Sequence, residues 1–252
     1  MILHLTLLLA AQGDLASAPS ALPAAQEPTT TKVWTGTVNG GLTMVSGNNE
    51  SVTGNLSATL ARTWGAWAAD AYAGYTGVRT TDQATGDAST TARILTFGAG
   101  GKRFLDDTNN LYVYVKGGDR RDEPNGLIER VDLGGGGGYK FDLYENAWIN
   151  LEAGAAWVSE ELVGVADKED TGAVRAAYNF EAPFLKNAKA YGKGEYLNGG
   201  DVEAFVSTTG VSVAMSDKWS MFSELTLLYD GSPSPGFEDT DTIFTVGVSV
   251  KL

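Results

Sequence analysis

The sequence has no cysteine and a single histidine, His4. The absence of cysteine excludes a disulfide scaffold, a thiolate zinc site, a cysteine nucleophile and an acylated cysteine anchor. His4 lies in the segment that we expect to be cleaved off, so the mature chain would have neither a histidine base nor a histidine metal ligand. Paired carboxylates stay possible, but the sequence places no pair at a defined separation. We therefore predict a protein that is not an enzyme and holds no cofactor or metal.

Basic residues are also scarce: 18 Lys and Arg stand against 31 Asp and Glu, which gives a formal net charge of −13. Such a chain has no basic patch to neutralise phosphates, so a nucleic-acid partner is excluded. Acidic segments at residues 167–170 and 238–241 allow two interpretations, solvated loops or sites for a hard cation such as calcium. Solvated loops are the better interpretation, because neither segment has the spacing of an EF-hand.

Long hydrophobic runs are missing as well. The apolar residues 1–11 are too few to span a bilayer as a helix and are typical of a signal peptide. Several Ala-rich cleavage sites lie between Ala11 and Ala25. We predict a signal peptide over residues 1–25, a flexible periplasmic lead-in over residues 26–32 and a folded domain over residues 33–252. No later stretch approaches the roughly 18 apolar residues of a transmembrane helix, so membrane insertion would need strands.

What the sequence does have is a period of two. Along residues 34–44, apolar residues and glycine on one face alternate with threonine, asparagine and glycine on the other. Such alternation predicts strands with one apolar face. The segment 89–104 is the least regular, because Arg93 and Arg103 share a face with apolar side chains. The pattern predicts about twelve strands, near residues 34–44, 51–60, 67–79, 89–104, 111–121, 127–141, 148–161, 171–181, 188–197, 202–215, 218–229 and 240–252.

Three features favour a membrane barrel over the alternative, a soluble β-sandwich. Strands of roughly ten or more residues match an apolar band about 25 Å tall, whereas strands of soluble proteins average about five or six residues. Longer connections, such as residues 162–170 and 230–239, alternate with short turns, such as residues 64–66 and 216–217. Aromatic residues gather at the short-turn ends, as a membrane interface requires: Trp34, Trp64, Trp67, Phe104, Phe141, Tyr144, Trp148, Phe184, Trp219 and Phe222.

These observations predict an all-β fold, a transmembrane antiparallel up-and-down β-barrel of about twelve strands in the bacterial outer membrane. Both termini and the short turns would face the periplasm. Outer-membrane lipids and lipopolysaccharide would then surround the barrel. The alternating strand at residues 244–252 resembles the final strand that the barrel-assembly machinery reads in outer-membrane proteins, although it ends in Leu252 instead of Phe or Trp.

Short motifs along the chain resemble one bacterial family. They include Trp34-Thr-Gly36, Leu111-Tyr-Val-Tyr114, Asp119-Arg-Arg-Asp122 and Leu151-Glu-Ala-Gly-Ala155, and the similarity extends over roughly residues 33–252. The sequence is similar to a family of salt-stress-induced outer-membrane proteins whose function is uncharacterised. The resemblance implies an outer-membrane barrel without an established substrate or activity.

A run of five glycines, Gly134 to Gly138, invites comparison with phosphate-binding loops. Neither a following Lys-Ser/Thr pair nor a helical pattern accompanies it, so that comparison fails. Val131 and Leu133 before the run stay in register with Tyr139 after it. We therefore predict a strand of reduced bulk, which would allow curvature or leave room inside the barrel.

Charged residues on the predicted strands need an inward position, because Lys or Arg facing lipid at mid-depth costs about 2–4 kcal/mol. Inside, they would line a narrow aqueous path for small solutes or pair into a plug that closes the interior. We expect a narrow passive channel or an envelope-integrity protein that responds to salt or osmotic stress. The alternative is a structural or adhesive barrel that acts through its surface loops without transport. The predicted lumen-lining residues are Asp70, Lys116, Arg130, Asp132, Glu152, Arg175, Lys189, Lys193, Glu195 and Glu224.

Overall fold

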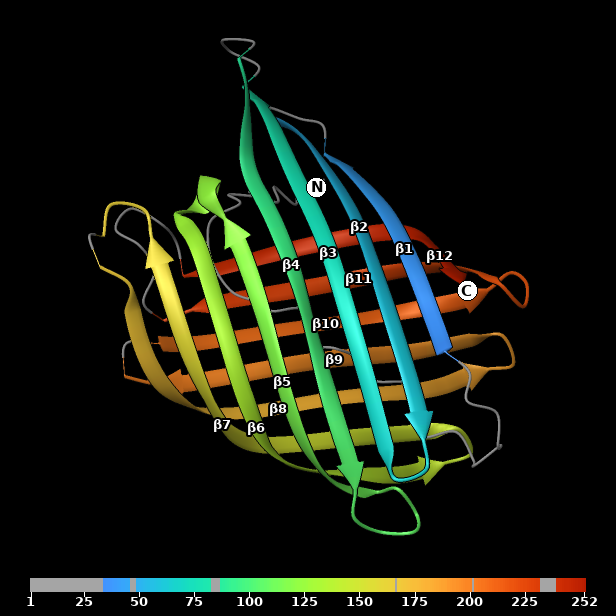
Figure 1. Ribbon diagram of the computed structural model, residues 1–252. Coiled ribbons are helices and arrows are strands. Elements are labelled where there is room, and N and C mark those ends of the chain that lie inside the picture. Colours follow the sequence, from blue (N-terminus) through green and yellow to red (C-terminus); the bar gives the residue numbers. More distant parts are fainter. Residues whose placement is uncertain (1–33, 46–48, 83–86, 166, 201, 232–238) are drawn as a thin grey trace, which may run out of the picture.

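The fold is a closed β-barrel, seen here in a computed structural model (Figure 1). The structure describes residues 34–45, 49–82, 87–165, 167–200, 202–231 and 239–252. The predicted signal peptide and lead-in, residues 1–32, lie outside the described residues. In the described part, no helix is long and apolar enough to cross a membrane.

Twelve antiparallel strands and one short 3-10 helix make up the described chain. Each strand pairs with its neighbours in sequence, and pairing of β1 with β12 closes the barrel. The predicted all-β, up-and-down architecture is therefore confirmed. The strands are β1 (Trp34–Val45), β2 (Asn49–Trp64), β3 (Trp67–Asp82), β4 (Ala88–Phe104), β5 (Leu111–Asp122), β6 (Leu127–Tyr144), β7 (Ala147–Leu162), β8 (Glu169–Leu185), β9 (Ala188–Gly199), β10 (Val202–Ala214), β11 (Trp219–Asp230) and β12 (Thr240–Lys251), with the helix η1 (Glu123–Asn125) between β5 and β6.

The alternation of side chains separates an apolar outer face from a more polar inner face. Mid-strand residues such as Leu56 on β2 and Val115 on β5 are 58% and 57% exposed, which is far above the value for a packed core. Their sequence neighbours on the other face are polar or small, because successive side chains of a strand point to opposite faces. The outer face of the barrel is thus more apolar than the inner face.

The irregular segment of β4 contains a register shift against β3, where Val78 pairs with Ala92 but Arg79 pairs with Thr90, and the outer face continues regularly after it. Leu95 and Phe97 are 41% and 46% exposed on the outer face. Arg93 lies near the start of β4, where it pairs with Glu123 at 2.7 Å, and Arg103 lies near its end, 5.5 Å from the ring centroid of Trp67. The two arginines therefore share the outer face with apolar residues but occupy its two edges.

Both described chain ends, Trp34 and Leu252, lie at the end of the barrel that carries the connections 65–66, 105–110, 145–146, 186–187 and 215–218. We call this the turn end and the opposite one the loop end. Two connections depart from the alternation of lengths, as the sequence already indicates: residues 105–110 form a longer one at the turn end, and β9 and β10 are joined by a short one at the loop end. The lengths of the connections thus alternate only roughly.

Most of the predicted aromatic belt lies exposed at the turn end, as Trp34, Trp67 and Trp219 show. Trp148 and Phe222 are 8% and 7% exposed and share the inner face with polar neighbours, so they do not belong to the belt. Towards the loop end, part of the interior is filled by a buried apolar cluster. Its buried members are Ala156, Val158, Ala173, Leu197, Val202, Ala204, Val206 and Leu228.

Candidate functional site

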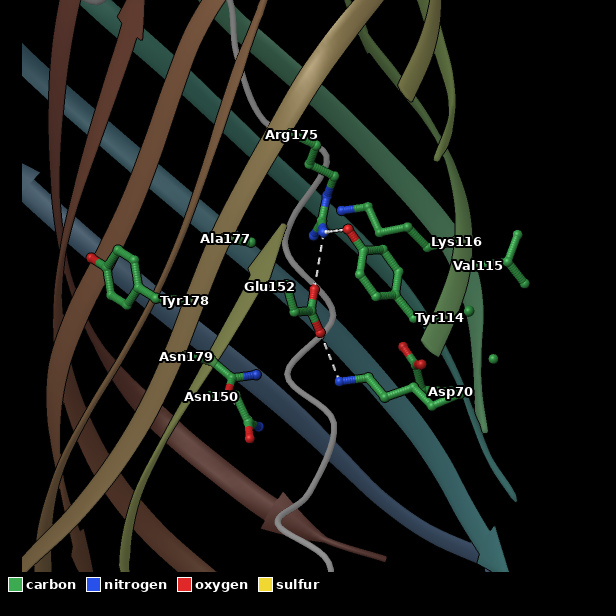
Figure 2. Close-up of a pocket in the computed structure, with 13 residues that line it drawn as sticks. Asp70, Tyr114, Val115, Lys116, Asn150, Glu152, Arg175, Ala177, Tyr178 and Asn179 are labelled. Atoms are coloured by element: carbon green, nitrogen blue, oxygen red, sulfur yellow. Dashed lines mark hydrogen bonds and ion pairs between the residues drawn. The ribbon is translucent and has the colours of Figure 1, made fainter. Parts of the chain in front are cut away.

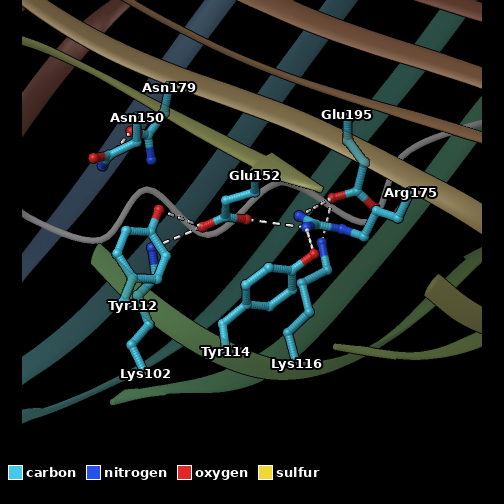
Figure 3. A network of polar contacts seen from close by, with 9 residues as sticks. All are labelled: Lys102, Tyr112, Tyr114, Lys116, Asn150, Glu152, Arg175, Asn179 and Glu195. Carbon is cyan, nitrogen blue, oxygen red and sulfur yellow. Dashed lines mark hydrogen bonds and ion pairs between the residues drawn. The ribbon is translucent and has the colours of Figure 1, made fainter. Parts of the chain in front are cut away.

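Five charged side chains form a chain of ion pairs across the barrel interior, which we call the charge bridge: Lys102, Glu152, Arg175, Glu195 and Lys116 (Figure 3). Lys102 Nζ lies 2.8 Å from Glu152 Oε1. Arg175 donates from Nη1 to Glu152 at 3.0 Å and from Nη2 to Glu195 at 2.9 Å. Lys116 donates to the same Glu195 oxygen. Because β4 is no neighbour of β7, nor β5 of β9, these contacts pass through the interior.

Two tyrosines of β5 reinforce the charge bridge. The Tyr112 hydroxyl donates to Glu152 Oε1 at 3.0 Å, and Lys102 Nζ lies 4.1 Å from the Tyr112 ring centroid. The Tyr114 hydroxyl accepts a hydrogen bond of 2.6 Å from Arg175, whose guanidinium carbon lies 4.9 Å from the Tyr114 ring centroid. Lys102 and Arg175 thus each have a carboxylate partner and an aromatic face, an arrangement that stabilises a cation away from water.

The glycines of β6 and β7 make room for these tyrosines. A Cβ on Gly138 would lie 2.5 Å from the Tyr112 ring, and one on Gly154 would lie 2.8 Å from the Tyr114 hydroxyl. Gly136 lies opposite Gly154, and its Cβ would approach the Ala153 carbonyl oxygen to 2.1 Å. The five-glycine run is therefore a strand, as predicted, and Gly138 within it leaves space for the Tyr112 ring.

Burial makes the charge bridge electrostatically consequential. The Arg175 and Glu195 side chains are 3% and 5% exposed, and those of Lys102, Lys116 and Glu152 are 9–13% exposed. Charges removed from water are tolerated when they are paired and hydrogen-bonded, and loss of one partner is costly. Three cations and two carboxylates leave one positive charge in excess, and Asp70 on β3 lies close enough to interact with Lys102 and Lys116.

Asp70 faces a small cavity next to the charge bridge (Figure 2). The cavity has a volume of about 30 Å³, room for little more than water, and its lining includes Gly100, Lys102, Lys116 and Glu152. The Asp70 side chain belongs to a residue that is 7% exposed, and within the described structure its Oδ2 atom has no hydrogen-bond partner. Asp70 is thus a buried acid that shares a cavity with Lys102 and Lys116, and among the described residues it forms an ion pair with neither.

The structure brings five of the ten predicted lumen residues to this place: Asp70, Lys116, Glu152, Arg175 and Glu195. Lys193 lies close enough to interact electrostatically with Lys116, and the other four lie elsewhere along the barrel wall. Arg130 donates from Nε to Glu160 at 2.8 Å, Lys189 pairs with Glu181 at 2.6 Å, Glu224 accepts from Tyr191 at 2.8 Å, Asp132 is 5% exposed, and Lys193 interacts with Glu224.

Sequence reasoning missed Lys102, Tyr112 and Tyr114. Lys102 lies in the irregular segment, but its spacing of two from Gly100 and Gly98 would have placed it on the inner face. The two tyrosines share the period of Lys116 on β5, so the same alternation would have found them. Among the described residues, no group of three or more Asp and Glu side chains is arranged to hold a metal ion.

Comparison with known proteins gives similarity of low identity to barrel structures. The translocator domain of the autotransporter NalP from Neisseria meningitidis is 14% identical, with a TM-score of 0.47, and the match covers 89% of this chain and 90% of that one. The KdgM porin in complex with disordered oligogalacturonate is 8% identical, with a TM-score of 0.48 and coverage of 86% and 98%. An anion-selective porin from Comamonas acidovorans is 9% identical, with a TM-score of 0.39 and coverage of 88% and 99%. No curated protein sequence matches. Residues 38–252 match the family described as "Protein of unknown function, DUF481", and the chain therefore belongs to this family.

Proposed function

We propose that the protein is an exported barrel of the bacterial outer membrane, with the turn end in the periplasm. An apolar outer face on strands of 12–18 residues supports this, since such strands are long enough to cross the hydrocarbon layer when tilted. Aromatic side chains at the turn end suit the membrane interface. Membrane lipids and lipopolysaccharide would contact the outer face, and the barrel-assembly machinery would insert the chain.

The position of the barrel in a membrane is testable with one substitution on the outer face. Leu56→Arg puts a cation at the middle of β2. It should lower the free energy of unfolding of the barrel in lipid vesicles by about 2–4 kcal/mol. Leu185→Arg, at the turn end of β8, should cost less than about 1 kcal/mol. Equal costs at the two positions would contradict a membrane-facing surface.

We propose further that the barrel is a narrow passive channel for small solutes, without enzymatic activity. One observation carries this proposal: charged and tyrosine side chains from β4, β5, β7, β8 and β9 meet inside a wall whose outer face is apolar. The charge bridge would form the constriction. Polar groups at a constriction replace part of the hydration of a passing ion or small polar solute.

Planar-bilayer recording tests the channel. Purified protein should produce discrete conductance steps, and liposomes that contain it should release small solutes but retain large ones. Protein that inserts, with the heat-modifiable gel mobility of a folded barrel, but neither conducts nor releases solutes would contradict the proposal.

The charge bridge itself favours a second candidate, a closed barrel that supports envelope integrity during salt or osmotic stress. Ion pairs cross the interior and join opposite parts of the wall, and the cavity beside them, of about 30 Å³, holds little more than water. A closed barrel would not conduct, yet its deletion would sensitise cells to osmotic shock. Purified protein that does not conduct, together with sensitivity of the deletion strain to osmotic shock, would therefore favour this candidate over the channel.

A further inference from the structure

Asp70 is a buried acid whose side chain is not used by the charge bridge, and it belongs to the constriction on which the proposed channel function rests. Its residue is 7% exposed, and Oδ2 has no hydrogen-bond partner within the described structure. A carboxylate withdrawn from water without a partner is unfavourable. A second arrangement in which a cation reaches Asp70 would remove this cost.

The wall between Asp70 and Lys116 offers a route for such contact. The two residues flank Gly100 in one row of the barrel, since Asp70 lies opposite Gly100 on one side and Lys116 lies opposite it on the other. A Cβ on Gly100 would lie 3.1 Å from Asp70 Oδ1 and 3.5 Å from the Lys116 Cβ. Glycine at this position therefore leaves open the space through which the two side chains would meet.

Lys116 is also the cation of the charge bridge that is easiest to release. Lys102 is held by Glu152 and by the Tyr112 ring, and Arg175 contacts both carboxylates. If Lys116 leaves Glu195, Arg175 still donates to that carboxylate at 2.9 Å. The move would leave no carboxylate unpaired and would give Asp70 a partner.

We propose that Asp70 is an alternative acceptor for Lys116, and that exchange of Lys116 from Glu195 to Asp70 opens the constriction. The Lys116–Glu195 contact joins β5 to β9 across the interior. A Lys116–Asp70 contact would lie along the wall formed by β3, β4 and β5 and withdraw the lysine from the passage. Each state has its own complement of ion pairs, so the two compete as a bistable element.

Single-channel recording of matched variants tests this exchange. Asp70→Asn weakens the open arrangement and should lower the open probability about tenfold, the effect of losing one charge-assisted hydrogen bond. Gly100→Ala obstructs the route without changing a charge and should act in the same direction. Gly101→Ala, whose Cβ would have its nearest neighbour at 3.9 Å, and Asp107→Asn in the connection 105–110 are the controls.

The Lys116→Met background identifies the cation that moves. In that background Asp70→Asn should leave the open probability unchanged, because the lysine that exchanges is gone. If Asp70→Asn lowers only the conductance of the open state, or acts equally with and without Lys116, the proposed exchange of Lys116 is wrong. The proposed channel function would be unaffected by that result. If wild type and every folded variant fail to conduct, the channel proposal itself fails and the exchange falls with it.

Discussion

Removal of the Arg175 guanidinium should destabilise the barrel by about 3 kcal/mol. Arg175→Met deletes hydrogen bonds to Glu152, Glu195 and the Tyr114 hydroxyl, at 3.0, 2.9 and 2.6 Å, from a side chain that is 3% exposed. Loss of one partner from a buried ion pair typically costs about 3–5 kcal/mol. The lower end applies because Lys102 still pairs with Glu152 and Lys116 still pairs with Glu195.

Unfolding by urea in lipid vesicles, followed by tryptophan fluorescence, measures this cost. Arg79→Met, which changes an exposed side chain of β3, is the control and should change the free energy of unfolding by less than about 0.5 kcal/mol. Arg175→Lys should fall between the two, since one ammonium group lacks the planar fork that reaches both carboxylates. A cost below about 1 kcal/mol for Arg175→Met would refute the view that the charge bridge holds the barrel interior together.

Three further predictions concern single positions. Gly136→Ala should cost at least about 3 kcal/mol or block assembly, because its Cβ meets a carbonyl oxygen at 2.1 Å, whereas Gly137→Ala, with 3.8 Å to its nearest neighbour, should fold normally by heat-modifiable gel mobility. Tyr112→Phe removes a donor to Glu152 and should cost about 1–2 kcal/mol in urea unfolding. A hydrogen bond from a threonine hydroxyl holds the pKa of Asp106 below its ordinary value. The stability that this carboxylate contributes is therefore present above its unfolded pKa of about 3.9 and is lost as the pH falls through the lower folded pKa. NMR titration of the carboxyl group measures the folded pKa.

Alternation predicted the barrel well because a strand with an apolar outer face and a more polar inner face must repeat with a period of two. The irregular segment of β4 shows the limit of this signal. Arg93 and Arg103 lie on the outer face among apolar residues, but near the two ends of the strand. The edges of the outer face accept charges that its middle does not. Position along the strand, and not only the side of the strand, decides where a cation is tolerated.

Alternation assigned faces but could not predict which inward residues meet. Lys116 and Glu195 are 79 residues apart and lie on strands that are not neighbours. Their contact depends on how the strands are staggered when the barrel closes, and on the height at which each side chain then lies. Sequence periodicity contains neither quantity, so the charged residues of the interior were predicted as a set and their pairing was not.

Burial also decides which ion pairs of this barrel would sense external salt. Screening by ions is strong between exposed charges and weak between buried ones, so the charge bridge should change little with ionic strength. At the loop end, Glu129 pairs with Arg121 at 2.8 Å and with Lys168 at 2.7 Å, and those basic side chains are 48% and 43% exposed. If the barrel responds to salt, the response should therefore begin at this exposed cluster of Arg121, Glu129 and Lys168, and reach the charge bridge only through movement of the strands.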